Sequence, residues 1–187
     1  MLPIRYRSAT GKPRISVTQV LTFAGRINTE WFTEESCWRG TAVHRLTEQY
    51  DRGESFVTPP GLGGYLDAYA TFLAVVRPVY ADIELKVQSD ELDLGGQIDR
   101  VCLELFGRPG HLDLKTGPPY PWHGQQLAGY NQLKPTGARW CLYLRDDGTY
   151  RLKMYDDPID NRRFVFDLAT VRGQVLPDGD HWVRKVA

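Results

Sequence analysis

The sequence predicts an α+β fold, in which helices flank a β-sheet. Apolar residues recur at helical spacing in residues 38–50. Two later segments, 96–106 and 110–115, are largely apolar and have the alternating pattern of strands. The sequence RPG at 108–110 favours a turn that folds these strands into a hairpin. We therefore expect helices and strands within the same domain.

The other elements follow from caps, turns and composition. Ser16 or Thr18 is expected to cap a short helix that runs to about Ala24. An apolar helix over 64–76 ends before Pro78, because proline cannot continue a helix. The full set in chain order is the short helix, a helix from about Thr33 to Tyr50, the helix at 64–76, strands near 79–89, 96–106 and 110–115, a helix around Gln126, two strands around 140–145 and 150–155 joined by the Asp-Asp-Gly turn at 146–148, and a last helix near 158–174.

Length and composition predict one domain over residues 1–187, because a chain with 42% hydrophobic residues can bury one core. Residues 1–14 are expected to form a basic and flexible arm, which either contacts DNA or is a solvated end. Its basic residues are Arg5, Arg7, Lys12 and Arg14. No apolar run reaches the roughly 18 residues of a membrane span. The N-terminus lacks the apolar core of a signal peptide, so a cytoplasmic location is expected.

Cysteine and histidine usage argues against several kinds of site. The three cysteines are too few and too scattered for a disulfide framework, a zinc site or a four-cysteine iron–sulfur cluster: Cys37, Cys102 and Cys141. Zinc hydrolases usually show two histidines at helical spacing. None of the four histidines pairs in that way: His44, His111, His123 and His181.

The sequence HLDLKTG at 111–117 is the most informative motif. Side chains alternate between the faces of a strand, so His111, Asp113 and Lys115 share one face. A carboxylate beside an ammonium group, on a strand whose other face is buried, can hold a divalent metal. The lysine then stabilises the negative charge of the group that the metal polarises. The same spacing also occurs in solvated strands, where it forms an ordinary ion pair.

A second acid, Asp99, lies in the apolar sequence GGQIDRV at 95–101. It is either an ordinary ion-pair partner of Arg100 or Lys86, or a neighbour of Asp113 across the predicted hairpin. Two carboxylates close together in a partly buried place repel each other unless a cation joins them. Oxygen ligands of this kind suit hard divalent cations.

Two predicted helices carry further polar residues. Gly40, His44 and Glu48 are four residues apart and lie on one helix face, and the glycine in mid-helix suggests close packing. A lone helical histidine is also common as a hydrogen-bonded structural residue. Gln126 and Tyr130 likewise share one face of a later helix. A capping or surface role is the alternative for that pair.

In this order, the four motifs resemble the RecB-like branch of the PD-(D/E)XK nuclease superfamily, and small phage-encoded exonucleases of that branch in particular. The motifs are Gly-x-x-x-His-x-x-x-Glu, Gly-x-Ile-Asp-Arg, Asp-x-Lys-Thr-Gly and Gln-x-x-x-Tyr. The resemblance extends from about residue 15 to about residue 135. It also draws on SVTQVL at 16–21, EWFTEES at 30–36 and QQLAGY at 125–130. It implies a restriction-endonuclease-like α/β/α core, with a mixed central β-sheet flanked by helices.

The resemblance implies a metal site for Mg²⁺ or Mn²⁺. Its ligands would be His44, Asp99 and Asp113, with the backbone carbonyl of Leu114 as a further ligand. Asp113 stands where many relatives have glutamate, so the ligand position is expected to shift by about one methylene without loss of activity. Glu84 is often acidic in similar sequences, but no ligand role is assigned to it.

The resemblance also implies roles around the metal. Lys115 would be the catalytic lysine, which orients or activates the attacking water. Gln126 and Tyr130 would organise the site or touch the DNA. Trp122, in PPYPWHG, is the tryptophan most expected to touch a base or sugar.

The net charge of zero argues against a DNA-binding protein, because phosphate contacts favour basic domains. A bound metal would offset the acids of the site and weaken this objection. We therefore expect a metal-dependent deoxyribonuclease, and specifically an exonuclease that processes duplex DNA ends for recombination. The alternatives are a structure-specific or nicking endonuclease with the same core, and a catalytically silent DNA-binding module.

The expected partner is DNA, in the form of duplex ends. By analogy with phage systems, a single-strand annealing recombination protein is a further expected partner, and relatives that form rings make a homo-oligomer conceivable. If the protein is phage-encoded, its location would be the host cytoplasm. No membrane partner is expected.

Overall fold

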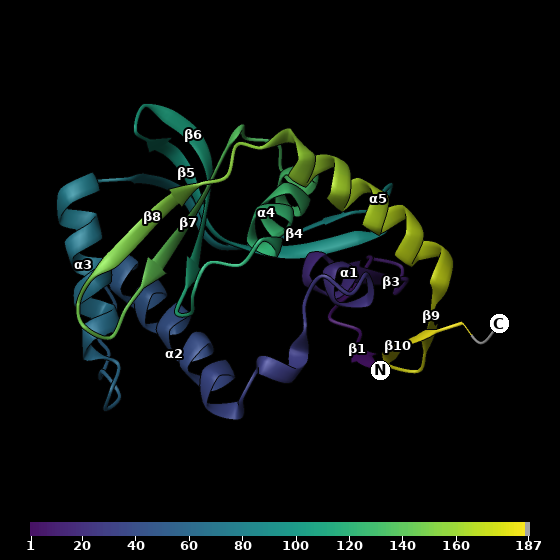
Figure 1. Ribbon diagram of the computed structural model, residues 1–187, viewed down its shortest axis with the longest axis horizontal. Coiled ribbons are helices and arrows are strands. Elements are labelled where there is room, and N and C mark those ends of the chain that lie inside the picture. Colours follow the sequence, from purple (N-terminus) through teal and green to yellow (C-terminus); the bar gives the residue numbers. More distant parts are fainter. Residues whose placement is uncertain (186–187) are drawn as a thin grey trace.

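The computed structural model describes residues 1–185 and has a curled β-sheet with helices on both faces (Figure 1). Its elements in chain order are β1 (Leu2–Pro3), β2 (Tyr6–Arg7), β3 (Pro13–Ser16), α1 (Val17–Phe23), the 3₁₀-helix η1 (Thr29–Trp31), α2 (Glu34–Asp51), α3 (Gly63–Val76), β4 (Val79–Ser89), β5 (Leu94–Leu105), β6 (Arg108–Lys115), α4 (Trp122–Leu133), β7 (Ala138–Leu144), β8 (Tyr150–Met154), α5 (Pro158–Gln174), β9 (Val175–Asp178) and β10 (His181–Arg184).

The main sheet is mixed. Its strand order is β2-β3-β5-β6-β7-β8, and β4 pairs with β5 beside this path. The pairs β3–β5 and β6–β7 are parallel, whereas the other neighbours are antiparallel. A small second sheet, β1-β10-β9, joins the two ends of the described chain. The α+β class and the mixed central sheet flanked by helices are thus confirmed, as in a restriction-endonuclease-like fold.

Two hydrophobic cores lie on the two faces of the main sheet. One packs α1, α4 and α5 against it, and the other packs α2 and α3. On β6, Leu112 and Leu114 are fully buried in the second core. Lys115 instead reaches Gln126 of α4 on the first face. This confirms the alternation expected for the strand. Within the described residues, no helix has the length and apolar character needed to cross a membrane.

Local sequence signals place several element boundaries. Ser16 caps α1 in a capping box with Gln19, and Thr33 caps α2 through the N–H of Ser36. The helix α5 begins at Pro158, where proline is tolerated because its missing N–H has no intrahelical partner. These helices match the expected ones closely.

The hairpin between β5 and β6 is confirmed, but its expected turn is wrong. The chain reverses at Phe106 and Gly107, which have φ values of 53° and 73°. Two successive residues with positive φ are typical of the tight turns that suit hairpin twist, and glycine adopts this conformation at no steric cost. The RPG sequence at 108–110 already belongs to β6.

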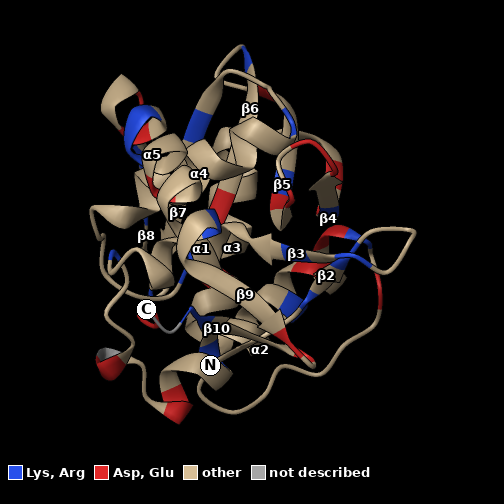
Figure 2. Ribbon diagram, turned by 90° about the vertical axis from the view of Figure 1, so that its right-hand side faces the viewer, with Lys and Arg blue, Asp and Glu red and all other residues tan. Residues whose placement is uncertain are grey.

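Residues 1–14 are folded against the domain and do not project from it as a flexible arm. β1 pairs with β10 and β2 pairs with β3. Figure 2 shows the basic residues of this region beside acidic ones. Three of its four basic side chains form ion pairs with acids: Arg7–Asp180 at 2.7 Å, Lys12–Asp93 at 2.7 Å and Arg14–Asp93 at 2.5 Å. Their charges are neutralised within the chain, so this expectation is corrected.

The main sheet forks along one edge of β5, where the pairing partner changes from β3 to β6. β4 pairs with it along one edge, from Leu94 to Glu104. The opposite edge is shared, because β3 pairs only with Leu94 and Gly95, and β6 begins to pair at Arg100. Residues 96–99 lie between these two partners. Asp99 therefore stands where the sheet divides.

Gly129 determines how closely α4 approaches its neighbours. A Cβ atom there would lie 2.7 Å from Val17 Cγ1 and 2.7 Å from ring atoms of Phe164. Gly129→Ala is expected to lower the free energy of unfolding by about 1–3 kcal/mol, because overpacking outweighs the helix preference of alanine.

Gly173 of α5 provides the control, because no atom lies within 4 Å of a Cβ atom built there. Gly173→Ala should leave stability unchanged or raise it by up to about 1 kcal/mol. Urea unfolding measures both, and equal stabilities would contradict the packing argument.

Candidate active site

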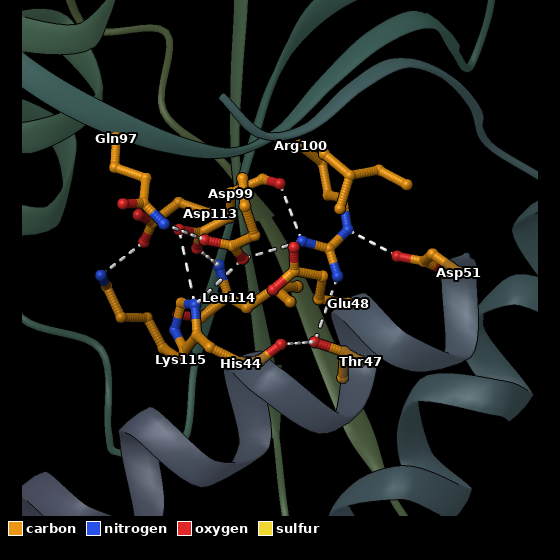
Figure 3. A network of polar contacts seen from close by, with 12 residues as sticks. His44, Thr47, Glu48, Asp51, Gln97, Asp99, Arg100, Asp113, Leu114 and Lys115 are labelled. Carbon is orange, nitrogen blue, oxygen red and sulfur yellow. Dashed lines mark hydrogen bonds and ion pairs between the residues drawn. The ribbon is translucent and has the colours of Figure 1, made fainter. Parts of the chain in front are cut away.

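His44 brings α2 to the two strands that carry acids, and Figure 3 shows it beside Asp99. His44 Nδ1 lies 3.5 Å from Asp99 Oδ1 on β5 and 3.6 Å from Glu84 Oε1 on β4. Its Nε2 lies 3.1 Å from the carbonyl oxygen of Leu114. Ligand atoms of His44, Glu84 and Asp99 all lie within 4.8 Å of one another. One imidazole and two carboxylates at this spacing could hold a divalent cation.

The electrostatics of His44 also fit a cation at this point. Burial lowers the pKa of His44, but the charges of Asp99 and Glu84 outweigh it and raise the pKa to about 9. A protonated imidazole therefore joins the two acids at neutral pH. Its side chain is 29% exposed, so the cluster is open to solvent. A metal ion would replace the proton as the positive charge that the acids require.

Asp99 is held at the fork of the sheet. Its Oδ2 accepts a hydrogen bond from the backbone N–H of Leu114 at 2.7 Å. Burial, together with the charges of Asp113 and Glu84, raises the pKa of Asp99 to about 6, although His44 opposes the shift. An ionised carboxylate in such a place is stabilised by a nearby cation. In the described part of the chain, Arg100 pairs with Asp51 and Glu84, so Asp99 is not its ion-pair partner.

Glu84 belongs to the cluster although sequence reasoning gave it no role. Its φ is 53° inside β4, a conformation that costs a non-glycine residue about 1–3 kcal/mol. The register with β5 is the same immediately before and after it, at Ile83 and Leu85, so the distortion is local. Its carboxylate accepts hydrogen bonds from Gln97 Nε2 at 2.6 Å and Arg100 Nη1 at 3.0 Å. The only signal in the sequence was an acid in the strand before the hairpin.

Lys115 lies beside this cluster. Its Nζ is 2.5 Å from Asp113 Oδ2 and donates to Gln126 Oε1 at 2.9 Å. Gln126 Nε2 in turn donates to the hydroxyl of Tyr130 at 3.0 Å. Burial lowers the pKa of Lys115, but Asp113 outweighs it, and the pKa lies above its ordinary value. The ammonium therefore persists at neutral pH.

The residues expected at the site lie in one region, but Asp113 is not among the three residues whose ligand atoms cluster. The carboxylate of Asp113 forms an ion pair with Lys115. Glu84, not Asp113, is the third residue of the cluster whose ligand atoms lie within 4.8 Å of one another. His111 shares the strand face but is fully buried. Among the described residues neither of its ring nitrogens has a hydrogen-bond partner.

An aromatic pair borders Lys115. The rings of Tyr120 and Trp122 are stacked, with centroids 6.3 Å apart and planes inclined by 11°. Lys115 Nζ lies 5.6 Å from the centroid of Trp122. Behind the pair, His123 Nδ1 accepts the N–H of Tyr120 at 3.3 Å and lies 2.8 Å from the hydroxyl of Tyr143. Burial lowers the pKa of His123 to about 2, so its ring is neutral and able to accept.

Comparison with known proteins bears on the fold. No protein-family model matches the chain, and no curated protein matches its sequence. Among solved structures, LHK-Exo in complex with dAMP is 13% identical and has a TM-score of 0.50, with 86% of each chain covered. The chain shares the fold of LHK-Exo. A second structure, an alkaline exonuclease (LHK-Exo) from Laribacter hongkongensis, is 13% identical with the same coverage and a TM-score of 0.49. SSO0001 is 15% identical, with 84% of this chain and 76% of that chain covered and a TM-score of 0.40.

Proposed function

We propose that this protein is a metal-dependent deoxyribonuclease, and specifically an exonuclease that acts on duplex DNA ends. The observation that carries the proposal is the convergence of His44, Glu84 and Asp99 beside the Asp113–Lys115 pair. Hydrolysis of a phosphodiester requires a reactive water and stabilisation of negative charge. This cluster combines groups suited to both requirements.

The proposed metal ligands are His44, Asp99, Asp113 and the carbonyl of Leu114, and the structure adds Glu84 as a further candidate. When bound, Mg²⁺ or Mn²⁺ would lower the pKa of a bound water molecule and neutralise negative charge on a phosphate oxygen. The imidazole and the carboxylates would hold the cation and fix its position beside Lys115. Their number and type suit a hard cation with oxygen ligands.

Lys115 provides the positive charge beside the attacking water. Its ammonium orients that water and stabilises the negative charge that develops on the phosphate. Gln126 holds the ammonium in place through its 2.9 Å hydrogen bond, and Tyr130 holds Gln126. Asp113 keeps Lys115 protonated and near the cation.

The preference for an exonuclease comes from the resemblance to phage-encoded exonucleases and from the shared fold with LHK-Exo, whose structure holds dAMP. Processing of ends for recombination, a single-strand annealing partner, a homo-oligomer and a cytoplasmic location are proposed on the same resemblance. Sedimentation of the purified chain, alone and with linear DNA, tests the oligomer.

One assay separates the candidate activities. Linear duplex and closed circular duplex of the same sequence are incubated with the protein and Mg²⁺, Mn²⁺ or a chelator. Metal-dependent release of nucleotides from the linear DNA alone is expected. Cleavage of the circle would favour the structure-specific or nicking endonuclease. DNA binding without any product, with either metal, would favour the catalytically silent module.

Trp122 is proposed to contact a base or sugar near the site. Base–aromatic stacking contributes about 1–3 kcal/mol per base. Trp122→Ala is therefore expected to raise KM for DNA by about tenfold, while Trp122→Phe keeps most of the affinity. Steady-state kinetics on linear DNA measures both values. A fall in kcat at constant KM would instead assign Trp122 to holding the ammonium of Lys115, which lies 5.6 Å from its ring.

A further inference from the structure

Arg100 on β5 is fully buried, and each nitrogen of its guanidinium donates a hydrogen bond (Figure 3). Nε donates to Asp51 Oδ2 at 2.6 Å, and Nη2 donates to Thr47 Oγ1 at 3.1 Å. Nη1 donates to Glu84 Oε1 at 3.0 Å and to the backbone carbonyl of Asp99 at 2.7 Å. One side chain thus joins α2, β4 and β5.

Two of these contacts lead directly to the candidate cation site. Glu84 Oε1 accepts from Arg100 and lies 3.6 Å from His44 Nδ1. Thr47 Oγ1 accepts from Arg100 and donates to the backbone carbonyl of His44 at 3.0 Å. The guanidinium therefore holds both the carboxylate of Glu84 and the helical turn that carries His44.

The backbone of Glu84 needs this support. Its φ of 53° is unfavourable for a non-glycine residue, and such strain persists only where the surroundings determine the conformation. Gln97 donates to Glu84 Oε2 and Arg100 donates to Glu84 Oε1. The two donors leave the carboxylate one orientation, which faces His44.

The charge of Arg100 is shared between Glu84, which belongs to the site, and Asp51, which lies outside it. A buried cation next to a metal site would weaken metal binding if it were unpaired. Asp51, whose side chain is 5% exposed, takes part of this charge through its 2.6 Å ion pair on the side of the guanidinium away from Asp99 (Figure 3). When a metal ion replaces the proton of His44, the remaining charged groups carry an excess of two negative charges, which one divalent ion balances. The negative groups are the carboxylates of Asp51, Glu84, Asp99 and Asp113, and the positive groups are Arg100 and Lys115.

We propose that Arg100 is a positioning residue of this site, which places Glu84 and His44 for cation binding without touching the cation or DNA. The proposal rests on the proposed function, since it assumes a cation held by His44, Glu84 and Asp99. Arginine suits the role because its planar fork reaches several elements at once. Lysine keeps the charge but has neither the shape nor the number of fixed donors.

Calorimetric titration of Arg100→Lys with Mn²⁺ tests the proposal, at a temperature where circular dichroism shows the variant folded. Affinity for Mn²⁺ is expected to fall at least tenfold, and kcat at saturating Mn²⁺ is expected to fall as well. Arg14→Lys is the matched control, because Arg14 is also buried (3% exposed) and also pairs with two acids, Asp90 and Asp93. It should lose stability without any change in Mn²⁺ affinity.

Wild-type Mn²⁺ affinity in the folded Arg100→Lys variant would overturn the proposal, as would equal losses of affinity in both lysine variants. If Arg100→Lys does not fold, Thr47→Val replaces it. That substitution removes the hydroxyl between Arg100 and His44 while keeping the shape of the side chain. A severalfold loss of Mn²⁺ affinity is then expected, and an unchanged affinity overturns the proposal.

Measurements on the wild-type protein distinguish failure of the positioning role from failure of the proposed function. If the wild-type chain binds Mn²⁺ and degrades linear DNA while the Arg100 and Thr47 variants bind Mn²⁺ equally well, only the positioning role is lost. If the wild-type chain binds no Mn²⁺ and releases no nucleotides, the proposed function fails and the positioning role fails with it.

Discussion

Lys115→Ala is expected to lower kcat for DNA cleavage by about 10³-fold, within the range observed for loss of a general acid–base or charge-stabilising group. The ammonium lies 2.5 Å from Asp113 and 2.9 Å from Gln126, so it is fixed beside the proposed cation. Binding of Mn²⁺ and DNA should remain close to wild type, because neither is proposed to depend mainly on this side chain. Single-turnover kinetics measures the cleavage step, and calorimetry measures the Mn²⁺ affinity.

The matched control for this variant is Lys12→Ala. Lys12 also pairs with an acid, Asp93, but it is 59% exposed and belongs to the N-terminal segment. Its loss should leave kcat unchanged. Unchanged kcat in Lys115→Ala would show that the lysine takes no part in cleavage. The role of Asp113 as the residue that holds Lys115 would then need another explanation.

Mn²⁺ is expected to raise the Tm of the wild-type protein, and Asp99→Asn is expected to abolish this rise and to lower cleavage by about 10³-fold. The amide oxygen can still accept the N–H of Leu114, which bonds Asp99 at 2.7 Å, so the fork of the sheet should persist. Without metal, the variant should be no less stable than wild type, because repulsion from Glu84 and Asp113 is relieved. Thermal unfolding with and without Mn²⁺ measures both effects. A normal Mn²⁺ shift would show that Asp99 is not a ligand.

Calorimetric titration with Mn²⁺ compares how much each of the other proposed ligands contributes to Mn²⁺ affinity. Glu84→Gln and Asp113→Asn should each weaken Mn²⁺ binding, and His44→Ala should lower activity by orders of magnitude without unfolding α2. Unchanged affinity in Asp113→Asn would make that residue only the partner of Lys115. A His44→Ala variant that is destabilised but active would restore a structural role for the histidine.

Much of the local structure was accessible from sequence, because it depends on short-range rules. Ser16, one of the two expected caps, caps α1, and α2 begins beside Thr33, near its expected start. Both boundaries were accessible because a side chain that satisfies a free N–H acts within one helical turn. The β5–β6 turn was misplaced, because RPG and the Phe106–Gly107 pair are both good turn signals. The twist of the strands decides between them.

The basic arm was misjudged for a different reason. Sequence shows the charges of Arg7, Lys12 and Arg14 but not the acids that meet them. The partner of Arg7 is 173 residues away, and Asp93 is about 80 residues from the other two. Only the folded chain brings these charges together.

By itself the sequence determined the α+β class and the placing of Asp113 and Lys115 on one face of a strand, because strand and helix periodicities are properties of the backbone. The tertiary structure alone decided that Glu84 turns toward His44 and that Arg100 lies between Asp51 and Glu84. Both depend on a strained φ and on ion pairs that span up to 49 residues. Such contacts form only where the packing of α2 against β4 and β5 compensates for strain and buried charge, and no local pattern records that balance.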